Sequence, residues 1–517
     1  MATRFTRRRF LAAAGAGLTY IALANTVGCD RRERIPKAKT PKAKTPNGGS
    51  VTPKVRPTPN VSSGPSKGVR AFRSRPDLHP PAVTVSRQAR GQASGHVFIA
   101  PKLGLGQHGP MIIDDSGRPV WFRDRKYALN FKVQHYRGEP VLTWWEGKAT
   151  PHPSVGEYVI LDGSYREITR VQAGNGYGGN QHDFLITPQG TALLTVYNHV
   201  RWDLSPLGGP VAGLATEGVV QEVDIETGEV LFEWHSLEHV GIEESYRKPH
   251  YKKLLGSVVV DYFHLNSIDV DHDGNLLVSA RNTWAVYKID RTSGEVLWRL
   301  GGKMSDFEMG EGTETAYQHD ARRQEDGTIT IFDNGAGPRV HPVSRGIVVE
   351  LDEDNMSATL VRAYTHPDNL VSTSQGGMQV LPNGNVFVGW GSQPFFSEFS
   401  HDGELLFDAH LPPSDDSYRA FRFPWKGHPA DAPAVAVDRG PHDEVALYAS
   451  WNGATEVATW EVLAGSRPDR LEPLGSVPRD GFETAMAART AEPYVAVRAK
   501  DSSGRVLGAS KPVKSGS

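Results

Sequence analysis

Between about residues 96 and 430 the chain alternates short apolar runs with polar ones, and turns rich in Gly, Asn and Asp separate them. Alternation with a period of two predicts β-strands, and long helical patterns are few. Two short elements recur in this region. One is a turn followed by an apolar strand, as in DHDGN before LLVSA (276–280) and LPNGN before VFVGW (386–390). The other is a hairpin, as in DIETGEVLFEW (224–234) and DRTSGEVLWRL (290–300).

Pairing each turn-strand element with the hairpin that follows it divides this region into six units, which begin near residues 97, 132, 183, 266, 320 and 377. Such a regular repeat predicts a six-bladed β-propeller over residues 96–430, with four strands in each blade. A β-sandwich or two small barrels is the alternative, but neither predicts so regular a repeat. Residues 235–262 interrupt the pattern, and we expect an insertion with a short helix there.

After about residue 430 the repeat ends, although alternating strands continue as EVALYASWNG, VATWEVLAG and PYVAVRAKD. We therefore predict a second domain over residues 431–517, a small β-sandwich that resembles a fibronectin type III or immunoglobulin-like module. The fold class of the whole chain is accordingly predicted as all-β.

The first 29 residues have the features of an export signal. Three arginines at 7–9 precede Phe10 and Leu11, and a weakly apolar stretch rich in Ala and Gly follows. This pattern predicts export by the twin-arginine (Tat) pathway. A short basic membrane helix is the alternative, but Ala and Gly give such a helix little lipid affinity.

Cys29 ends this segment where a bacterial lipoprotein signal would place its lipidated cysteine. We expect an extracytoplasmic protein that is anchored to the cell membrane by a lipid on Cys29. Thr26 departs from the lipoprotein pattern, so cleavage to a soluble mature chain stays open. Because Cys29 is the only cysteine, the chain can form no internal disulfide.

Residues 30–95 are rich in Lys, Arg, Pro, Ser and Thr, include the tandem repeat PKAKT-PKAKT (36–45), and show almost no apolar period. We expect a disordered spacer, whose positive charge would lie favourably against anionic lipid headgroups; a plain solvated linker is the other interpretation. Over the whole chain 57 Lys and Arg balance 59 Asp and Glu, so charge gives no reason to expect a nucleic-acid partner.

Polar residues stand at the entries of several predicted blades, where a propeller's innermost strands line its central channel. His182, His264 and His319 precede or begin the third, fourth and fifth of these strands, and Arg281 ends the next strand of the fourth blade. Three histidines in register are expected to converge on one volume. The alternative is that they are hydrogen-bonded structural residues inside the channel.

Arg281 indicates which chemistry the histidines would serve. A permanent guanidinium charge opposes a divalent cation but pairs with two oxygens of a sulfate or phosphate group. We therefore predict an anion-directed site that uses no metal. Arg322 and Arg323, next to His319, could add to the positive field.

The entries QHDF (181–184), FHLNSID (263–269) and QHDARR (318–323), with SARNTW (279–284), resemble the bacterial arylsulfotransferase family over roughly residues 95–412. The resemblance implies a six-bladed propeller that transfers a sulfuryl group from a phenolic sulfate ester to a phenol, without a nucleotide cofactor and through a sulfated histidine. The implied partners are thus an aryl sulfate donor and a phenolic acceptor.

Carried over by motif, the resemblance makes His319 the nucleophile. It assigns the sulfate oxygens to His264 with Asn266 and Arg281, and the phenol oxygens to His182. In the sixth unit Ser372, Thr373 and Gln375 are further candidates for sulfate binding, although the motif does not align them. These roles are chemically consistent, because a neutral imidazole attacks sulfur without an external base and a two-step transfer gives ping-pong turnover.

Two other classes of function stay open. One is an exported hydrolase or lyase that uses the same histidines, with or without a metal. The other is a non-catalytic propeller that binds a cell-wall or phenolic ligand and is attached to a surface by its C-terminal domain.

Overall fold

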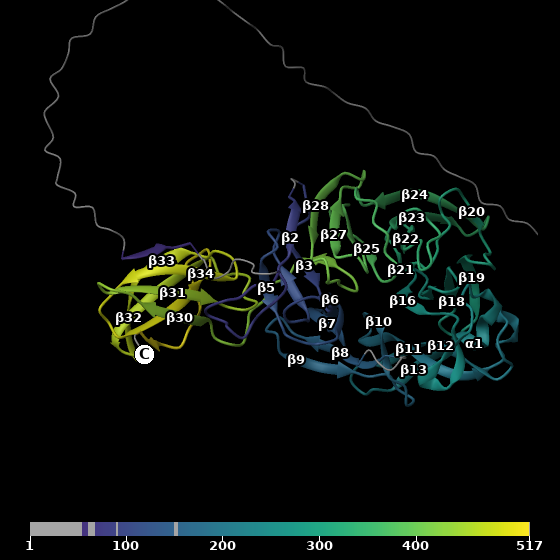
Figure 1. The fold of residues 1–517 in the computed structure, drawn as a ribbon, viewed down its shortest axis with the longest axis horizontal. Coiled ribbons are helices and arrows are strands. Elements are labelled where there is room, and N and C mark those ends of the chain that lie inside the picture. Colours follow the sequence, from purple (N-terminus) through teal and green to yellow (C-terminus); the bar gives the residue numbers. More distant parts are fainter. Residues whose placement is uncertain (1–53, 60–67, 89–90, 149–153, 516–517) are drawn as a thin grey trace, which may run out of the picture. The chain divides into compact units, whose positions relative to one another are not determined.

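A computed structural model of the chain describes residues 54–59, 68–88, 91–148 and 154–515 (Figure 1). The predicted export signal and Cys29 lie outside these residues. In the described ranges the fold is all-β, as predicted: the one α-helix is α1 (Ser236–His239), three 3-10 helices have three residues each, and the other elements are strands. None of the helices in these ranges has the length and apolar character needed to cross a membrane.

Between residues 96 and 410 all but three of the described strands follow in six runs, one of three strands and five of four, and consecutive strands within a run pair antiparallel. The first run contains β3 (His96–Ile99), β4 (Met111–Ile113) and β5 (Pro119–Phe122). The second contains β6 (Ala128–Tyr136), β7 (Glu139–Lys148), β8 (Val155–Leu161) and β9 (Glu167–Val171). The third contains β10 (Gly179–Ile186), β11 (Thr191–Trp202), β12 (Gly213–Asp224) and β13 (Val230–His235). The fourth run contains β16 (Leu265–Val270), β17 (Leu276–Ala280), β18 (Ala285–Ile289) and β19 (Val296–Gly301). The fifth contains β21 (His319–Arg323), β22 (Ile329–Asp333), β23 (Arg345–Asp352) and β24 (Ser357–Thr365). The sixth contains β25 (Gly377–Val380), β26 (Val386–Gly389), β27 (Phe395–Phe399) and β28 (Leu405–His410). Each run starts at or just before a position predicted from the repeat.

The first strands of the six runs lie around one centre (Figure 1). Contacts connect β3 with β6, β6 with β10, β10 with β16, β16 with β21, and β21 with β25. Strand β29 (Phe421–Phe423) pairs with β3 and so supplies the fourth strand of the first sheet from the far end of the region. This brings the first strands, and the residues at their entries, close together.

The second and third runs share one sheet, because β8 pairs with β10 at Gly156 and Gly179. A Cβ atom on Gly156 would lie 2.4 Å from the carbonyl oxygen of Glu146, and one on Gly179 would lie 2.7 Å from the ring of Tyr158. Only glycine permits this close approach of the two strands.

The insertion predicted at 235–262 is confirmed, including its short helix. It contains α1, β14 (His250–Lys252) and β15 (Ser257–Asp261), and β15 runs parallel to β12. β15 leads directly to the residues just before β16, so the insertion delivers the chain to one of the predicted site histidines.

The prediction of a disordered spacer is wrong for the described residues between 54 and 95. β1 (Val55–Pro57) pairs with β34 (Glu483–Arg489), and β2 (Thr84–Arg87) pairs with β28. Phe72, Leu78 and Val83 are buried in a cluster built by strands far away in sequence. Isolated apolar residues that insert into a distant core leave no period in their own segment, which is why the pattern did not reveal them.

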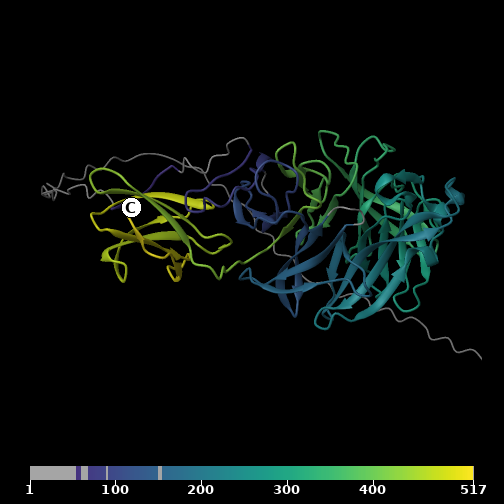
Figure 2. The same cartoon turned by 60° about the horizontal axis from the view of Figure 1, so that its bottom comes forward.

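After residue 430 the strands form two antiparallel sheets that surround one hydrophobic cluster containing Leu447, Trp460 and Val497 (Figure 2). One sheet contains β1, β34, β30 (Ala434–Arg439) and β31 (Glu444–Ser450); the other contains β32 (Thr459–Arg467), β33 (Arg470–Pro478), β35 (Tyr494–Lys500), β36 (Val506–Ala509) and β37 (Val513–Lys514).

Outside these two sheets, the short strand β20 (Glu308–Met309) extends the edge of the fifth run by pairing with β24.

Candidate active site

The structure brings the predicted histidines to one place at the centre of the six runs. The rings of His182 and His264 are 4.9 Å apart and nearly perpendicular. Burial, Arg281 and His264, in decreasing order of effect, lower the pKa of His319. The three side chains therefore share one electrostatic environment, as their positions at the strand entries predicted.

His319 is held in one orientation by Asn334, which follows β22. The Nδ1–H group of His319 donates to Oδ1 of Asn334 over 2.7 Å. Nδ2 of Asn334 donates to the carbonyl oxygens of Ser372 and Gln375, over 3.2 and 3.0 Å, so its amide oxygen must face the imidazole. The proton of His319 therefore resides on Nδ1, and Nε2 carries a lone pair.

The other two histidines are anchored in the same way, through Nδ1. His264 donates from Nδ1 to Oδ2 of Asp261 over 2.5 Å. Nδ1 of His182 bonds to Oδ1 of Asn180, whose Nδ2 in turn donates to the hydroxyl of Ser154 over 3.0 Å. Sequence reasoning missed Asn180 and Asp261, although each lies two or three residues before its histidine.

Burial and neighbouring positive charge keep His319 neutral. The residue is 1% exposed, and this desolvation, with Arg281 and His264 nearby, holds the pKa of His319 well below 6.5. A neutral imidazole with an unprotonated Nε2 is the form that acts as a nucleophile.

Arg281 is fixed beside the histidines, where the charge of Asp261 acts on it without a direct ion pair in the described residues. Its Nη2 donates to the carbonyl oxygen of Thr373 over 2.9 Å, and its guanidinium lies 4.6 Å from the ring centre of Tyr317. Burial lowers the pKa of Arg281, and within the described ranges no carboxylate forms an ion pair with it. Gly337 lies against Nη2 with a φ of 114°, and a Cβ there would be 2.6 Å away. This desolvated guanidinium suits an anion.

Asn266 lies deeper than the resemblance implies. The residue is fully buried, its Nδ2 donates to the carbonyl oxygen of Gln318 over 2.8 Å, and its own carbonyl accepts from Arg419 over 2.9 Å. Its Oδ1 has no hydrogen-bond partner in the described part of the chain. In this arrangement the amide N–H groups of Asn266 are directed toward the fifth run rather than toward Arg281.

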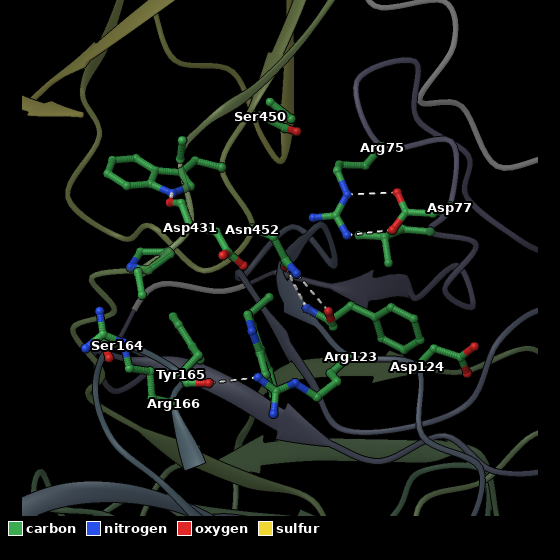
Figure 3. Close-up of a pocket in the computed structure, with 18 of the residues that line it drawn as sticks. Arg75, Asp77, Arg123, Asp124, Ser164, Tyr165, Arg166, Asp431, Ser450 and Asn452 are labelled. Carbon is green, nitrogen blue, oxygen red and sulfur yellow. Dashed lines mark hydrogen bonds and ion pairs between the residues drawn. The ribbon is translucent and has the colours of Figure 1, made fainter. Parts of the chain in front are cut away.

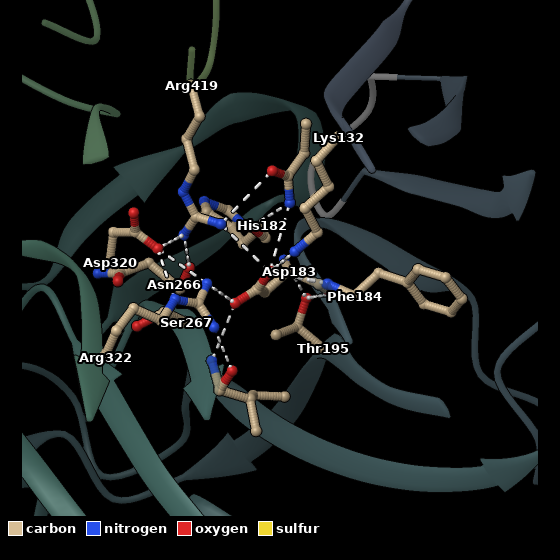
Figure 4. A network of polar contacts seen from close by, with 12 residues as sticks. Lys132, His182, Asp183, Phe184, Thr195, Asn266, Ser267, Asp320, Arg322 and Arg419 are labelled. Atoms are coloured by element: carbon tan, nitrogen blue, oxygen red, sulfur yellow. Dashed lines mark hydrogen bonds and ion pairs between the residues drawn. The ribbon is translucent and has the colours of Figure 1, made fainter. Parts of the chain in front are cut away.

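Below the histidines lies a buried charge network centred on Asp183 (Figure 4). Lys132, Arg322 and Arg419 reach its carboxylate over 3.2, 2.5 and 3.1 Å. Asp320 pairs with the same two arginines, over 2.8 and 3.3 Å. Burial alone would raise the pKa of Asp183, but these three cations hold it well below its ordinary value.

Neither Arg322 nor Arg323 adds a free positive charge to the site. Arg322 is neutralised in the Asp183 network. Arg323 pairs with Asp271 over 2.7 Å and with Glu353 over 3.1 Å. The prediction that these arginines reinforce the positive field is therefore wrong, because each has carboxylate partners supplied by other strands.

The strand entries adopt an irregular backbone. His264, Asp320 and Gln375 have φ values of 58°, 58° and 66°, in the left-handed region that non-glycine residues rarely adopt. The pairing register shifts between Leu265 and Ser267, and the fifth run has a similar shift after His319. Such bulges redirect side chains at the edge of a functional site.

The sixth run contributes Gln375 to the site. Its backbone N–H donates to Nε2 of His319 over 3.2 Å. Its side chain contacts Lys102, which pairs with Asp416 over 3.1 Å. Of the three candidates in this run, Gln375 thus contacts His319 directly, while Thr373 contacts Arg281 only through its carbonyl oxygen. A group that bonds to Nε2 has to displace the Gln375 N–H.

Two tyrosines beside His182 were not predicted from the sequence. Tyr418 is buried with its ring edge-on to His182 at 5.8 Å, and its hydroxyl has no hydrogen-bond partner in the described ranges. Tyr197 stacks on the other side of His182 at 5.0 Å. No spacing in the repeat marks either residue. The described residues contain no group of three or more His, Cys, Asp or Glu side chains arranged to hold a metal ion.

Comparison with known proteins places these residues in a family context. The sequence profile of a family described as Arylsulfotransferase (ASST) matches residues 132–411. No match was found among curated proteins. Similar solved structures include a protein of unknown function from Bacteroides caccae (15% identity, 64% of this chain and 100% of that chain, TM-score 0.38). They also include virginiamycin B lyase from Staphylococcus aureus (8% identity, 63% and 87%, TM-score 0.31) and the calcium-binding protein regucalcin from Agrobacterium tumefaciens (11% identity, 71% and 92%, TM-score 0.31).

Proposed function

The chain belongs to the arylsulfotransferase family, and on that premise we propose that it transfers a sulfuryl group from a phenolic sulfate ester to a phenol through a sulfated His319. The observation that carries this proposal is the state of His319. Its Nδ1–H is held by Asn334, so that Nε2 carries the lone pair, and Arg281 lies nearby without a direct carboxylate ion pair in the described part of the chain. The site thus contains a neutral nucleophile and a positive charge for the sulfuryl oxygens.

In the first half-reaction Nε2 of His319 attacks sulfur, and an Nε2–S bond forms as the bond between sulfur and the aryl oxygen breaks. The departing oxygen takes the electron pair and receives a proton from a protonated His182. In the second half-reaction the acceptor phenol returns a proton to His182 and attacks sulfur, and the Nε2–S bond breaks. Atoms and charge balance over the cycle without a nucleotide.

Arg281 and His264 stabilise charge on the sulfuryl oxygens in this scheme. Charge spreads over three oxygens during the transfer, and fixed donors in a buried site stabilise it without reorganisation. Asp261 keeps Nε2 of His264 directed toward the site. Asn266 can join them only if its amide turns away from Gln318.

The experiment is a measurement of 4-nitrophenol release from 4-nitrophenyl sulfate with increasing phenol. We expect release to rise with phenol concentration and double-reciprocal plots to be parallel, as ping-pong transfer requires. Intact-mass analysis without acceptor should show one added SO₃ group. Release that is independent of phenol would establish hydrolysis instead, and no release would favour a binding protein.

The pH dependence tests the state of His319. Its folded pKa lies well below 6.5, and the neutral imidazole is the attacking form. We therefore expect no loss of kcat/KM as pH falls past 6.5 and a decline only at lower pH. A decline centred at 6.5 or above would show that His319 is not buried and neutral in the free enzyme.

The same shift makes His319 a pH-dependent contributor to stability. Below pH 6.5 the unfolded chain binds a proton at His319 that the folded chain does not bind. Its contribution is therefore fully present above 6.5 and is lost as pH falls toward the folded pKa.

We propose further that the six runs form the six blades of one propeller and that the two C-terminal sheets form a β-sandwich. The contacts between successive first strands and the pairing of β29 with β3 support a closed ring. The cluster shared by the C-terminal sheets supports the sandwich. A crystal structure with a different number of sheets around the centre would contradict this.

Export by the Tat pathway and lipid attachment at Cys29 are part of the proposal, and they rest on the sequence of residues 1–29. Cys29→Ser should move the protein from the membrane fraction to the soluble extracytoplasmic fraction. An unchanged distribution would rule out the lipid anchor.

A further inference from the structure

A cavity of about 590 Å³ lies where β5 and the turn between β8 and β9 meet the C-terminal sheets (Figure 3). Its walls include Arg123, Arg166, Asp431 and Trp451. None of its lining residues belongs to the histidine site, so sulfuryl transfer does not account for it.

The walls of this cavity are held together by direct hydrogen bonds. The side-chain amide of Asn452 both accepts from the backbone of Phe122 and donates to it, over 3.0 and 2.9 Å. The hydroxyl of Tyr165 donates to the carbonyl oxygen of Gly453 over 2.7 Å and accepts from Trp425 over 3.0 Å. The cavity is therefore formed in advance of any ligand.

Arg123 supplies a positive charge that no carboxylate of the described residues contacts directly, although the charges of Glu167, Glu146 and Asp431 act on it from a distance. Its Nη2 donates to the carbonyl oxygen of Tyr165 over 2.8 Å, and its guanidinium lies 5.4 Å from the ring centre of Trp121. In the described residues no carboxylate forms an ion pair with Arg123. Desolvation and the nearby Arg125 lower the pKa of Arg123. An anionic ligand would provide the missing partner.

The carboxylates in the cavity limit which anion fits. Asp77 is occupied by Arg75 over 2.6 Å. Asp124 and Asp431 also line the cavity, and no ion pair to either is found in the described ranges. They would repel a small inorganic anion but accept hydrogen bonds from hydroxyl groups. A ligand that fits this cavity therefore carries an anionic group for Arg123 and hydroxyl groups for Asp124 and Asp431.

Trp451 connects this cavity to a second one of about 330 Å³. Both cavities are lined by Trp451 and by residues 429–432, and Nε1 of Trp451 donates to the carbonyl oxygen of Asp431 over 2.6 Å. An indole between two adjoining cavities offers apolar surface to the C–H face of a sugar ring. The shared wall suits a ligand that extends from one cavity into the other.

We propose that the two adjoining cavities bind an anionic oligosaccharide whose sugar units carry a carboxylate or a sulfate ester. Arg123 binds the anionic group, Asp431 and Asp124 accept from hydroxyls, and Trp451 packs against a sugar ring. This site would hold the protein on an acidic glycan with residues that the histidine site does not use. The proposal does not depend on the proposed sulfuryl transfer.

Calorimetric titration of the full chain with a galacturonate trisaccharide, a heparin-derived tetrasaccharide and neutral maltotetraose tests the proposal. We expect binding of at least one anionic oligosaccharide and none of maltotetraose. Arg123→Gln should weaken that binding at least about tenfold, because a charged hydrogen bond is lost. The matched control is Arg137→Gln. Arg137 is an exposed arginine that pairs with Glu226 outside the cavities, so this variant should bind the anionic oligosaccharide normally.

Sulfuryl transfer by Arg123→Gln, or its near-ultraviolet circular dichroism, checks that the variant is folded. Three results would overturn the proposal: no binding of either anionic oligosaccharide, equal binding of maltotetraose, or unchanged affinity of folded Arg123→Gln. Binding of the galacturonate trisaccharide would show that carboxylates suffice, whereas binding of the heparin fragment alone, which carries carboxylates as well, would show that sulfate groups are needed. Inorganic sulfate that binds as tightly as the oligosaccharides would show that the sugar contributes nothing, and this too would overturn it.

Discussion

Replacing His319 with alanine is expected to abolish sulfuryl transfer, with a loss in kcat/KM of at least about 10⁴-fold, because in the proposed mechanism His319 alone forms the covalent intermediate. The same variant should show no added SO₃ group when it is mixed with 4-nitrophenyl sulfate and analysed by intact mass. The physical reason is that Nε2 of His319 carries the attacking lone pair, as the bond from Nδ1 to Asn334 indicates.

The control for this prediction is His401→Ala. The His401 side chain is 71% exposed and pairs only with the adjacent Asp402, so its removal should leave turnover unchanged. Circular dichroism of His319→Ala establishes that the variant folds despite the buried site. Transfer that persists in a folded His319→Ala protein, or a sulfated mass that persists in it, would contradict the assignment of His319 as nucleophile.

Asn334→Ala distinguishes orientation from chemistry at the same site. Without the amide oxygen, the proton of His319 is no longer fixed on Nδ1, and the Ser372 and Gln375 carbonyls lose a donor. A positioning role for Asn334 would lower kcat more than it changes KM, whereas the sulfated His319 would still form.

The six strand runs could be predicted from the sequence because their signals are local. In the hairpins that begin at Asp224 and Asp290, one carboxylate oxygen accepts from backbone N–H groups two and three residues later. A turn of this kind is determined within a few residues, so its motif can be recognised wherever it recurs. The histidines were found for the same reason, since each stands at a fixed place in the repeat.

The charge network beside those histidines could not be predicted, because its members come from distant parts of the chain. Asn180 and Asp261, by contrast, lie close in sequence to the histidines that they hold. Arg419 and Asp183 are 236 residues apart in sequence, and Asn334 lies after the second strand of its run. The left-handed backbone at His264 and Asp320 also leaves no pattern, because these residue types are not glycine. The motif thus predicted candidate reacting groups but not the residues that orient them.

The charge network and the site share the same strands. His182 and His319 are each followed by a carboxylate of the network, Asp183 and Asp320, and Arg419 bonds to the backbone of Asn266. Successive residues of a strand point in opposite directions, so one directs its side chain to the site and the next to the network. The network therefore fixes the backbone positions from which the site residues project.

Asp183→Ala is accordingly expected to lower the free energy of unfolding by about 3–5 kcal/mol, the usual effect of removing one partner from a buried ion pair. Lys132 would lose its only ion-pair partner among the described residues, whereas Arg322 and Arg419 would still have Asp320. Urea unfolding measures the change. The control is Glu226→Ala, at an exposed pair with Arg137, which should leave the unfolding midpoint unchanged.

Adding Lys132→Met to Asp183→Ala tests the cause of that loss. The substitution removes the ammonium group that Asp183 no longer neutralises and replaces it with an apolar side chain of similar length, so the double variant should recover part of the stability. If the cost comes from the empty space left by the carboxylate instead, Lys132→Met will add its own destabilisation. An Asp183→Ala midpoint equal to that of Glu226→Ala would mean that the network does not stabilise the strands that carry the histidines.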